Sequence, residues 1–232
     1  MINFTFNGAT EDNSGHIMII GPTGCGKTNY LLNLIFGSPP KETVIYTHTP
    51  MQSKYQAMQT YFDILNATDF TTKKGIKKAV EQIEDLTSNK QVKNAMLDHF
   101  NKSFQCDLVG SDNPFPFRIA SPDNIIPPSE IDTNPRFVVF DDISVNSRTD
   151  QTKVKDYFAF GRNHGCKCVY LCQSYYDIPK FIRRNTRYFI LFKGIESRDI
   201  RQITSDHGCK ELPENYNHFT DKDHSFYVYS RL

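Results

Sequence analysis

Residues 21–28 read GPTGCGKT and fit the pattern G-x-x-x-x-G-K-[ST]. A short apolar run at 16–20 precedes this segment, and a stretch with helical character, 29–36, follows it. A buried strand, a glycine-rich turn and a helix in this order form a cradle for phosphate, because backbone N–H groups and the positive end of the helix dipole meet at the turn. The segment therefore predicts an α/β fold that binds a nucleotide through its phosphates.

The last residues of this segment have defined roles in such a cradle. Lys27 would reach the β- and γ-phosphates, and the Thr28 hydroxyl would ligate a Mg²⁺ ion that bridges the same oxygens. Cys25 is interpreted as a small residue that contributes its backbone N–H. The alternative, a glycine-rich turn that binds nothing, does not explain the strand before it and the helix after it. The predicted nucleotide-binding residues are Gly21, Pro22, Thr23, Gly24, Cys25, Gly26, Lys27, Thr28 and Asn29.

A second motif lies at 136–142, where four apolar residues end in the carboxylates of Asp141 and Asp142. A strand buried on both faces presents chemistry only at its carboxyl end, which is where open α/β sheets bind ligands. Asp141 would hold Mg²⁺ through water, and Asp142 would orient and polarise the attacking water. A solvated Asp-Asp turn is the alternative. Many ATPases carry glutamate at the second position, and Asp142 is shorter by one methylene.

A third apolar run, 168–172, ends in the polar pair Gln173 and Ser174. We expect this strand to insert between the phosphate-loop strand and the acidic strand, an arrangement of motor-type ATPases rather than of small-molecule kinases. Gln173 could then donate to the γ-phosphate or to the lytic water and act as a sensor of hydrolysis. The alternative is a surface amide at a strand end.

The composition fits one domain over residues 1–232. With 232 residues, 38% hydrophobic and 23% charged, the chain can bury one sizeable α/β core. Lys and Arg number 27 against 26 Asp and Glu, a formal net charge of +1, so any DNA contact must come from local patches.

The six cysteines show no C-x-x-C spacing, and we interpret the chain as a reduced, intracellular protein. A zinc site that includes Cys166 and Cys168 is disfavoured, because Cys168 and Cys172 fall on a predicted buried strand. The polar, acidic segment 1–15 and the absence of a long apolar run predict neither a secretion signal nor a membrane span.

Apolar runs alternate with helical patterns, as in a mostly parallel sheet flanked by helices. We predict strands at 17–20, 43–47, 137–140, 168–172 and 188–192, an edge strand at 225–230, and a helix from about 150 to the GRNHG segment. A helical insertion is expected at about 62–131, because apolar residues recur at helical spacing over 76–86 and again over 92–100. A proline-rich stretch from Pro114 to Pro135 then predicts loop until the next strand.

Four lysines open the first inserted helix and have two interpretations. Lys73, Lys74, Lys77 and Lys78 could contact DNA, but a solvated helix face is favoured, because Glu81 stands four residues after Lys77.

The segments GPTGCGKT, FVVFDD, GRNHG, VYLCQSYYDIPKFIRRN and RYFILFKG, in this order, resemble the viral genome-packaging ATPases of the FtsK/HerA superfamily found in poxviruses, other large double-stranded DNA viruses and virophages. The resemblance covers 17–37 and 136–201, with a distinctive block at 161–192, whereas 51–135 shows none. It implies an ASCE/RecA-like P-loop fold and a ring, pentameric or hexameric, that uses ATP to move double-stranded DNA into a preformed capsid. It also implies capsid vertex proteins as partners, no membrane, and a location inside the infected cell, in the cytoplasm or viral factory, or with the virion.

The same resemblance implies an arginine that completes the active site of a neighbouring subunit. Arg162 is our choice, since it matches the family's GRH-like block, and Arg148, Arg183 and Arg184 are competitors. The basic run Lys180, Arg183, Arg184 and Arg187 could contact the DNA backbone, form an interface or cap the sheet.

The leading hypothesis is therefore a DNA-packaging motor in which Lys27, Asp142, Gln173 and Arg162 act in ATP hydrolysis, with Thr28 and Asp141 at the metal. A related pump for chromosome or plasmid transfer is the first alternative, although such pumps usually carry flanking domains. A nucleoside or nucleotide kinase is the second, and no convincing arginine-rich lid supports it. A scaffold that binds nucleotide without hydrolysing it should have lost Lys27, Asp141 or Asp142, and all three are present.

Overall fold

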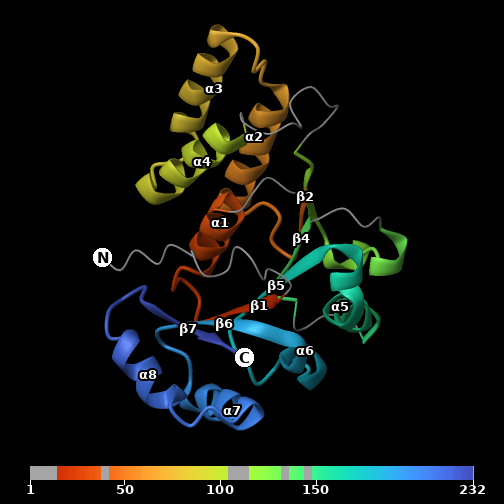
Figure 1. Ribbon diagram of the computed structural model, residues 1–232, viewed down its shortest axis with the longest axis vertical. Helices are drawn as coiled ribbons and strands as arrows, with labels where there is room; N and C mark the ends of the chain where they lie inside the picture. The colour runs from red at the N-terminus through yellow and green to blue at the C-terminus, as the bar shows by residue number, and fades with distance from the viewer. Residues whose placement is uncertain (1–14, 38–41, 104–114, 132–135, 144–147, 232) are drawn as a thin grey trace.

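The strands form one seven-stranded sheet in the computed structural model, which describes residues 15–37, 42–103, 115–131, 136–143 and 148–231 (Figure 1). The strand order is β3-β2-β4-β5-β1-β6-β7. All neighbouring pairs are parallel except β6 and β7, which are antiparallel. The strands are β1 (His16–Ile20), β2 (Glu42–Thr47), β3 (Phe117–Ala120), β4 (Arg136–Asp141), β5 (Cys166–Cys172), β6 (Thr186–Phe192) and β7 (Phe226–Ser230).

Helices cover both faces of this sheet (Figure 1). Alternate residues of β1 show why: Ile17 and Ile19 belong to one buried cluster, and Met18 and Ile20 belong to the other. A strand buried on both faces needs this continuous apolar run. The helices are α1 (Lys27–Gly37), α2 (Ser53–Ala67), α3 (Lys73–Asp85), α4 (Lys90–Ser103), α5 (Arg148–Phe160), α6 (Lys180–Asn185), α7 (Ser197–His207) and α8 (Leu212–Phe219), with short 3₁₀ turns η1 (Pro122–Asn124), η2 (Pro128–Glu130) and η3 (Gly161–His164).

Helices α2, α3 and α4 stand together to one side of the sheet, at the top of Figure 1. The two helices predicted over 76–86 and 92–100 are present as α3 and α4, and α4 packs against α1. Their buried side chains, Ala79, Ile83, Val92, Met96 and Phe100, join the same apolar cluster as α1. Helix α2 precedes them and was not predicted. This group of helices is therefore continuous with the main core.

The predicted loop between Pro114 and Pro135 is wrong at β3. Residues 117–120 form a parallel edge strand beside β2, with Phe117 opposite Thr43 and Ala120 opposite Tyr46. The prolines do not prevent this, because Pro116 precedes the strand and Pro122 follows it, so neither removes an N–H from the ladder. The Pro116 carbonyl instead accepts a hydrogen bond from the Thr43 N–H at 2.9 Å.

The rest of the predicted sheet is confirmed. Each predicted strand is present, β7 forms an edge, and β5 lies between β4 and β1 as expected. The predicted helix before the GRNHG segment is α5, which ends where η3 begins. Within the described ranges, every helix is too short or too polar to cross a bilayer.

Candidate nucleotide-binding site

The carboxyl ends of β1, β5 and β4 bring the three predicted motifs to one edge of the sheet. The register aligns Ile20 with Cys172 across β1 and β5, and Leu171 with Asp141 across β5 and β4. The phosphate-loop segment, Gln173 and the two carboxylates leave the sheet from these positions. We call this region, at the carboxyl ends of the central strands, the nucleotide edge.

Residues 21–26 turn from β1 into α1 with the geometry that glycine permits. Gly24 has φ 82° and Gly26 has φ 112°, in the left-handed region where other residues are strained. The Gly21 N–H donates to the Cys172 carbonyl at 3.2 Å, which ties the start of the loop to β5. The loop thus has a defined shape, and its glycines are required by its backbone angles.

The Lys27 side chain folds back over this loop. Its Nζ donates to the Gly21 carbonyl at 2.6 Å and to the Pro22 carbonyl at 3.0 Å. The Lys27 charge also lowers the pKa of Asp141, although burial outweighs this effect. The predicted lysine and the predicted metal ligand therefore belong to one electrostatic site.

Two residues after Lys27, the Asn29 amide oxygen is buried, with no hydrogen-bond partner among the described residues.

The Asp141 carboxylate is fixed by two hydroxyl groups. The Tyr55 hydroxyl donates to its Oδ2 at 2.6 Å, and the Thr47 hydroxyl lies 3.5 Å from the same oxygen. Burial is the main cause that raises the pKa of the Asp141 carboxyl, and the Asp142 charge adds to it. The hydrogen bond from Tyr55 acts in the opposite direction, since it favours the ionised form.

Asp142 differs from Asp141 in backbone and exposure. It adopts a left-handed conformation with φ 53°, and its side chain is exposed. Its N–H donates to the Leu171 carbonyl at 3.1 Å, and its Oδ2 accepts from the Gln173 Nε2 at 2.9 Å. The structure thus brings together the predicted water-activating carboxylate and the predicted sensor amide.

Three residues at this edge were missed in the sequence. Tyr55 comes from α2, in the region without resemblance, and its spacing on an amphipathic helix indicates only burial. Thr47 ends β2 and could have been found by the strand-end rule that identified Asp141. His224 adopts φ 59°, and its Nδ1 lies 3.1 Å from the Cys25 carbonyl. This contact joins the segment before β7 to the phosphate loop.

The residues at this edge fit a magnesium ion that is shared with phosphate. Mg²⁺ prefers hard oxygen ligands and is usually held by one or two protein groups, with phosphates and waters completing the shell. The Thr28 hydroxyl and the Asp141 carboxylate are such groups. Among the described residues there is no cluster of three His, Cys, Asp or Glu that could bind a metal without phosphate. A cation here would also favour ionisation of the buried Asp141.

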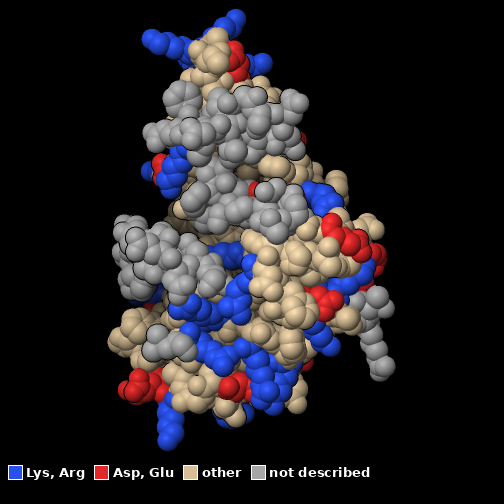
Figure 2. Space-filling view, turned by 45° about the vertical axis from the view of Figure 1, so that its right-hand side comes forward, with Lys and Arg blue, Asp and Glu red and all other residues tan. Residues whose placement is uncertain are grey.

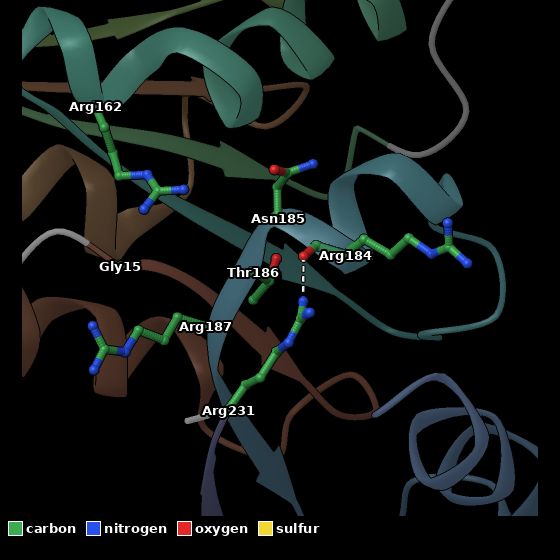
Figure 3. Close-up of a pocket in the computed structure, with 7 residues that line it drawn as sticks. All are labelled: Gly15, Arg162, Arg184, Asn185, Thr186, Arg187 and Arg231. Atoms are coloured by element: carbon green, nitrogen blue, oxygen red, sulfur yellow. Dashed lines mark hydrogen bonds between the residues drawn. The ribbon is translucent and has the colours of Figure 1, made fainter. Parts of the chain in front are cut away.

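Arg162 lies at the opposite end of the strands, where their amino termini meet. It belongs to η3, directly before β5, and lines a hollow of about 410 Å³ with Arg184, Arg187 and Arg231 (Figure 3). Arg162 and Arg231 point into this hollow, and Arg231 donates to the Arg184 carbonyl at 2.6 Å. Because the five residues of β1 span about 16 Å, Arg162 lies far from the phosphate loop of its own chain. We call this region the arginine edge.

Arg183, one of the competitors, is buried within the subunit. Its Nη1 lies 2.9 Å from Asp206 Oδ2, and its guanidinium carbon lies 4.7 Å from the centre of the Tyr175 ring. This side chain is committed to internal contacts, unlike the exposed Arg162 and Arg184. The side chain of Arg148 lies outside the described residues.

No protein-family model matches the sequence, and no curated protein matches it. Several solved structures, in contrast, match its fold. B204, the DNA-packaging ATPase of Sulfolobus turreted icosahedral virus, superposes with a TM-score of 0.53 at 11% identity, over 94% of this chain and 93% of that chain. The genome-packaging NTPase B204 of Sulfolobus turreted icosahedral virus 2 has a TM-score of 0.52 with AMPPCP (13% identity; 93% and 92% covered) and 0.50 with ATP-γS (11%; 94% and 93%).

The chain has the fold of these P-loop NTPases. This confirms the predicted fold class and agrees with the family resemblance at the level of structure. The match spans nearly the whole of both chains, so it includes the region 51–135, for which the sequence offered no resemblance.

Proposed function

We propose that the protein is an ATPase that moves double-stranded DNA into a viral capsid. The observation that carries the proposal is the hydrogen bond between Gln173 and Asp142 at the nucleotide edge, beside the phosphate loop. A catalytic carboxylate and a polar strand-end residue in contact are what a hydrolase needs to hold a water near a γ-phosphate. The B204 proteins, with the same fold, are described as genome-packaging enzymes, and this supports the DNA substrate.

In this proposal each residue of the nucleotide edge has a distinct task. Lys27 exchanges its loop carbonyls for phosphate oxygens, and the backbone N–H groups of the loop surround the phosphates. Thr28 and Asp141 would hold Mg²⁺, which would supply charge neutralisation at the phosphates. Asp142 accepts a proton from the attacking water, while the Gln173 amide orients that water.

We further propose that Arg162 acts in trans, on the nucleotide of a neighbouring copy of the chain in a ring. Its position at the arginine edge supports this, because it cannot reach its own phosphate loop. Two arginines that point into one hollow suit an incoming anionic group (Figure 3). A hydrolytic site shared between copies would explain why one edge carries the nucleotide-binding groups and the other carries the arginines.

The test is steady-state hydrolysis of Mg·ATP by the purified chain with and without double-stranded DNA, together with the mass of the assembly in solution. We expect hydrolysis that DNA stimulates, in a ring of several copies, and loss of hydrolysis in Asp142→Asn with ATP binding retained. Phosphate transfer to a nucleoside acceptor without DNA stimulation would instead identify a kinase. A hydrolysis rate that DNA leaves unchanged would remove the translocation proposal.

A further inference from the structure

The loop that follows Gln173 is held by one buried carboxylate. Asp199, in the first turn of α7, is only 1% exposed. Its Oδ1 accepts from the Tyr176 N–H at 2.9 Å and from the Ser174 hydroxyl at 3.2 Å, and its Oδ2 accepts from the Tyr175 N–H at 3.0 Å. All three donors come from consecutive residues of the loop. One side chain thus determines the backbone path directly after the sensor strand.

A buried carboxylate in this position needs such donors. Removal of its charge from water is costly unless several hydrogen bonds compensate. The two N–H groups lie beyond the end of β5 and have no partner in the sheet ladder, so they are the donors that the loop can offer. The carboxylate and the loop N–H groups therefore satisfy each other's hydrogen-bonding capacity.

A second carboxylate of α7 holds the same loop from another side. The Tyr175 hydroxyl donates to Asp206 Oδ2 at 3.0 Å, and the same carboxylate oxygen pairs with Arg183 of α6 at 2.9 Å. Asp199 and Asp206 lie about two helical turns apart, so both project from one face of α7. The difference between them is chemical. Asp199 binds the loop backbone, whereas the contact of Asp206 with the loop is to the Tyr175 hydroxyl at the tip of a side chain.

The position of Gln173 depends on this backbone more than on packing. Gln173 and Asp142 are both exposed, and Asp142 adopts a left-handed backbone conformation. Little apolar contact fixes either side chain, so the 2.9 Å bond between them relies on where the backbone places them. On the Gln173 side that placement is set by β5 before it and by the Asp199 contacts after it.

We propose that Asp199 is a positioning residue for Gln173 in ATP hydrolysis. It acts through the loop 174–176 and holds the Gln173 amide against Asp142, without touching nucleotide itself. This inference rests on the proposed function, because it requires that Gln173 take part in hydrolysis. It also adds α7, which lies outside the three predicted motifs, to the machinery of the nucleotide edge.

The experiment compares Asp199→Asn with the parent protein as the full chain in its assembled form. Asparagine keeps the size of the side chain but replaces one acceptor oxygen by an NH₂ group, which then faces a loop donor. We expect kcat for ATP hydrolysis to fall about 10- to 100-fold, as for other supporting residues behind a catalytic group. The Kd for ATP-γS should stay unchanged, because the phosphate loop is intact.

A double-mutant cycle shows whether the effect passes through Gln173. Gln173→Ala should lower kcat, and Asp199→Asn should cause no further loss when it is added to Gln173→Ala. If the two losses multiply, Asp199 does not act through Gln173 and the proposal is overturned. If Gln173→Ala leaves kcat unchanged, the sensor role fails and the positioning role fails with it. If Gln173→Ala lowers kcat but Asp199→Asn does not, only the positioning role is lost.

Asp206→Asn is the matched control, since it removes another carboxylate from the same face of α7 and leaves the backbone bonds to the loop in place. It should lower the melting temperature with little change in kcat. An equal fall in kcat for both variants would assign the effect to general loosening of the loop and overturn the proposal. Should Asp199→Asn fail to fold, Ser174→Ala removes one of the three bonds alone. We expect a several-fold lower kcat, again only when Gln173 is present.

Discussion

The two edges of the sheet differ in how their charged groups are balanced. At the nucleotide edge, Lys27 contacts loop carbonyls, Asp141 accepts from Tyr55 and Asp142 accepts from Gln173. At the arginine edge, four arginines line one hollow, and no acidic residue is among the described residues that line it. Lys and Arg side chains form a broad basic area in the lower half of the molecule (Figure 2). The charged groups of the nucleotide edge form hydrogen bonds with neutral groups of the chain, whereas the arginine edge gathers four cations around one hollow, which suits an anion.

This difference predicts which substitutions act within one copy and which act between copies. Variants of the nucleotide edge should damage the site of their own chain. Variants of the arginine edge should leave nucleotide binding intact and damage the site of a neighbour.

Arg162→Ala should lower kcat for ATP hydrolysis by on the order of 10³-fold, because an arginine supplied in trans stabilises charge that develops at the γ-phosphate. Binding of ATP-γS should not change. When copies with Arg162→Ala are mixed with copies carrying Lys27→Ala, part of the hydrolysis should return, since some interfaces then pair an intact loop with an intact arginine. Steady-state kinetics of each variant and of mixtures at several ratios measure this.

Arg184→Ala serves as the control at the same hollow, since its side chain points away from the centre (Figure 3). A large loss in Arg184→Ala with normal hydrolysis in Arg162→Ala would transfer the role to Arg184. The absence of any recovery in the mixtures would show that the arginine edge does not act between copies.

His16, at the start of β1, should make the stability depend on pH. Burial, with a smaller contribution from the Arg162 charge, lowers its pKa to about 4. The folded state thus favours neutral His16, and its stability is intact above the unfolded pKa of about 6.5 and is lost as the pH falls from there towards 4. When the pH falls from 7 to 5, the depressed pKa of His16 should lower the free energy of unfolding by about 2 kcal/mol. Urea titrations at both pH values measure the loss.

His16→Asn should remove this pH dependence, because asparagine does not titrate in this range. The hydrogen bond should be kept, since the asparagine amide oxygen can accept from the Cys168 N–H that binds His16 Nδ1 at 3.2 Å. His99 provides an internal reference, since its pKa is also lowered to about 4, mainly by burial, at a site remote from the arginine edge. Arg162→Ala should weaken the pH effect of His16 and leave that of His99 unchanged. Equal pH dependence in His16→Asn and the parent would contradict the assignment.

The smallest effect is expected at the tip of the helical group. Lys77 and Glu81 are 3.8 Å apart, but their side chains remain 81% and 63% exposed, so this pair should add little to stability. Lys77→Ala should leave the melting temperature and the DNA-stimulated hydrolysis unchanged. A marked loss of DNA stimulation would favour the DNA-contact interpretation of this lysine cluster and would place a second anion-binding region far from the arginine edge.

Most of the sheet could be predicted because its strands are long apolar runs between turn residues, as in 137–140 and 168–172. The strand β3 could not, because four residues among prolines carry too short a pattern. Helix α2 could have been predicted, because its buried residues Tyr55, Met58, Tyr61, Phe62 and Leu65 recur at helical spacing.

The same contrast holds for the candidate site. Asp141, Asp142 and Gln173 end apolar strands, so a local pattern identifies each of them. Tyr55 contacts Asp141, and Asp199 contacts the loop after Gln173, from helices elsewhere in the sequence, and nothing near them in the chain indicates these partners. The hollow at the arginine edge is assembled from positions 15, 162, 184–187 and 231, so only the folded sheet reveals it.

The place of β1 in the sheet has a consequence for protein synthesis. β1 is the first described strand to leave the ribosome, yet both of its neighbours, β5 and β6, begin at residues 166 and 186. The nascent chain therefore carries the apolar residues 17–20 without a partner strand while β2, β3 and β4 emerge. Such exposed strands are prone to aggregation until they pair. The proposed phosphate loop therefore reaches its place beside β5 and β6 late in synthesis, although its sequence motif is translated early.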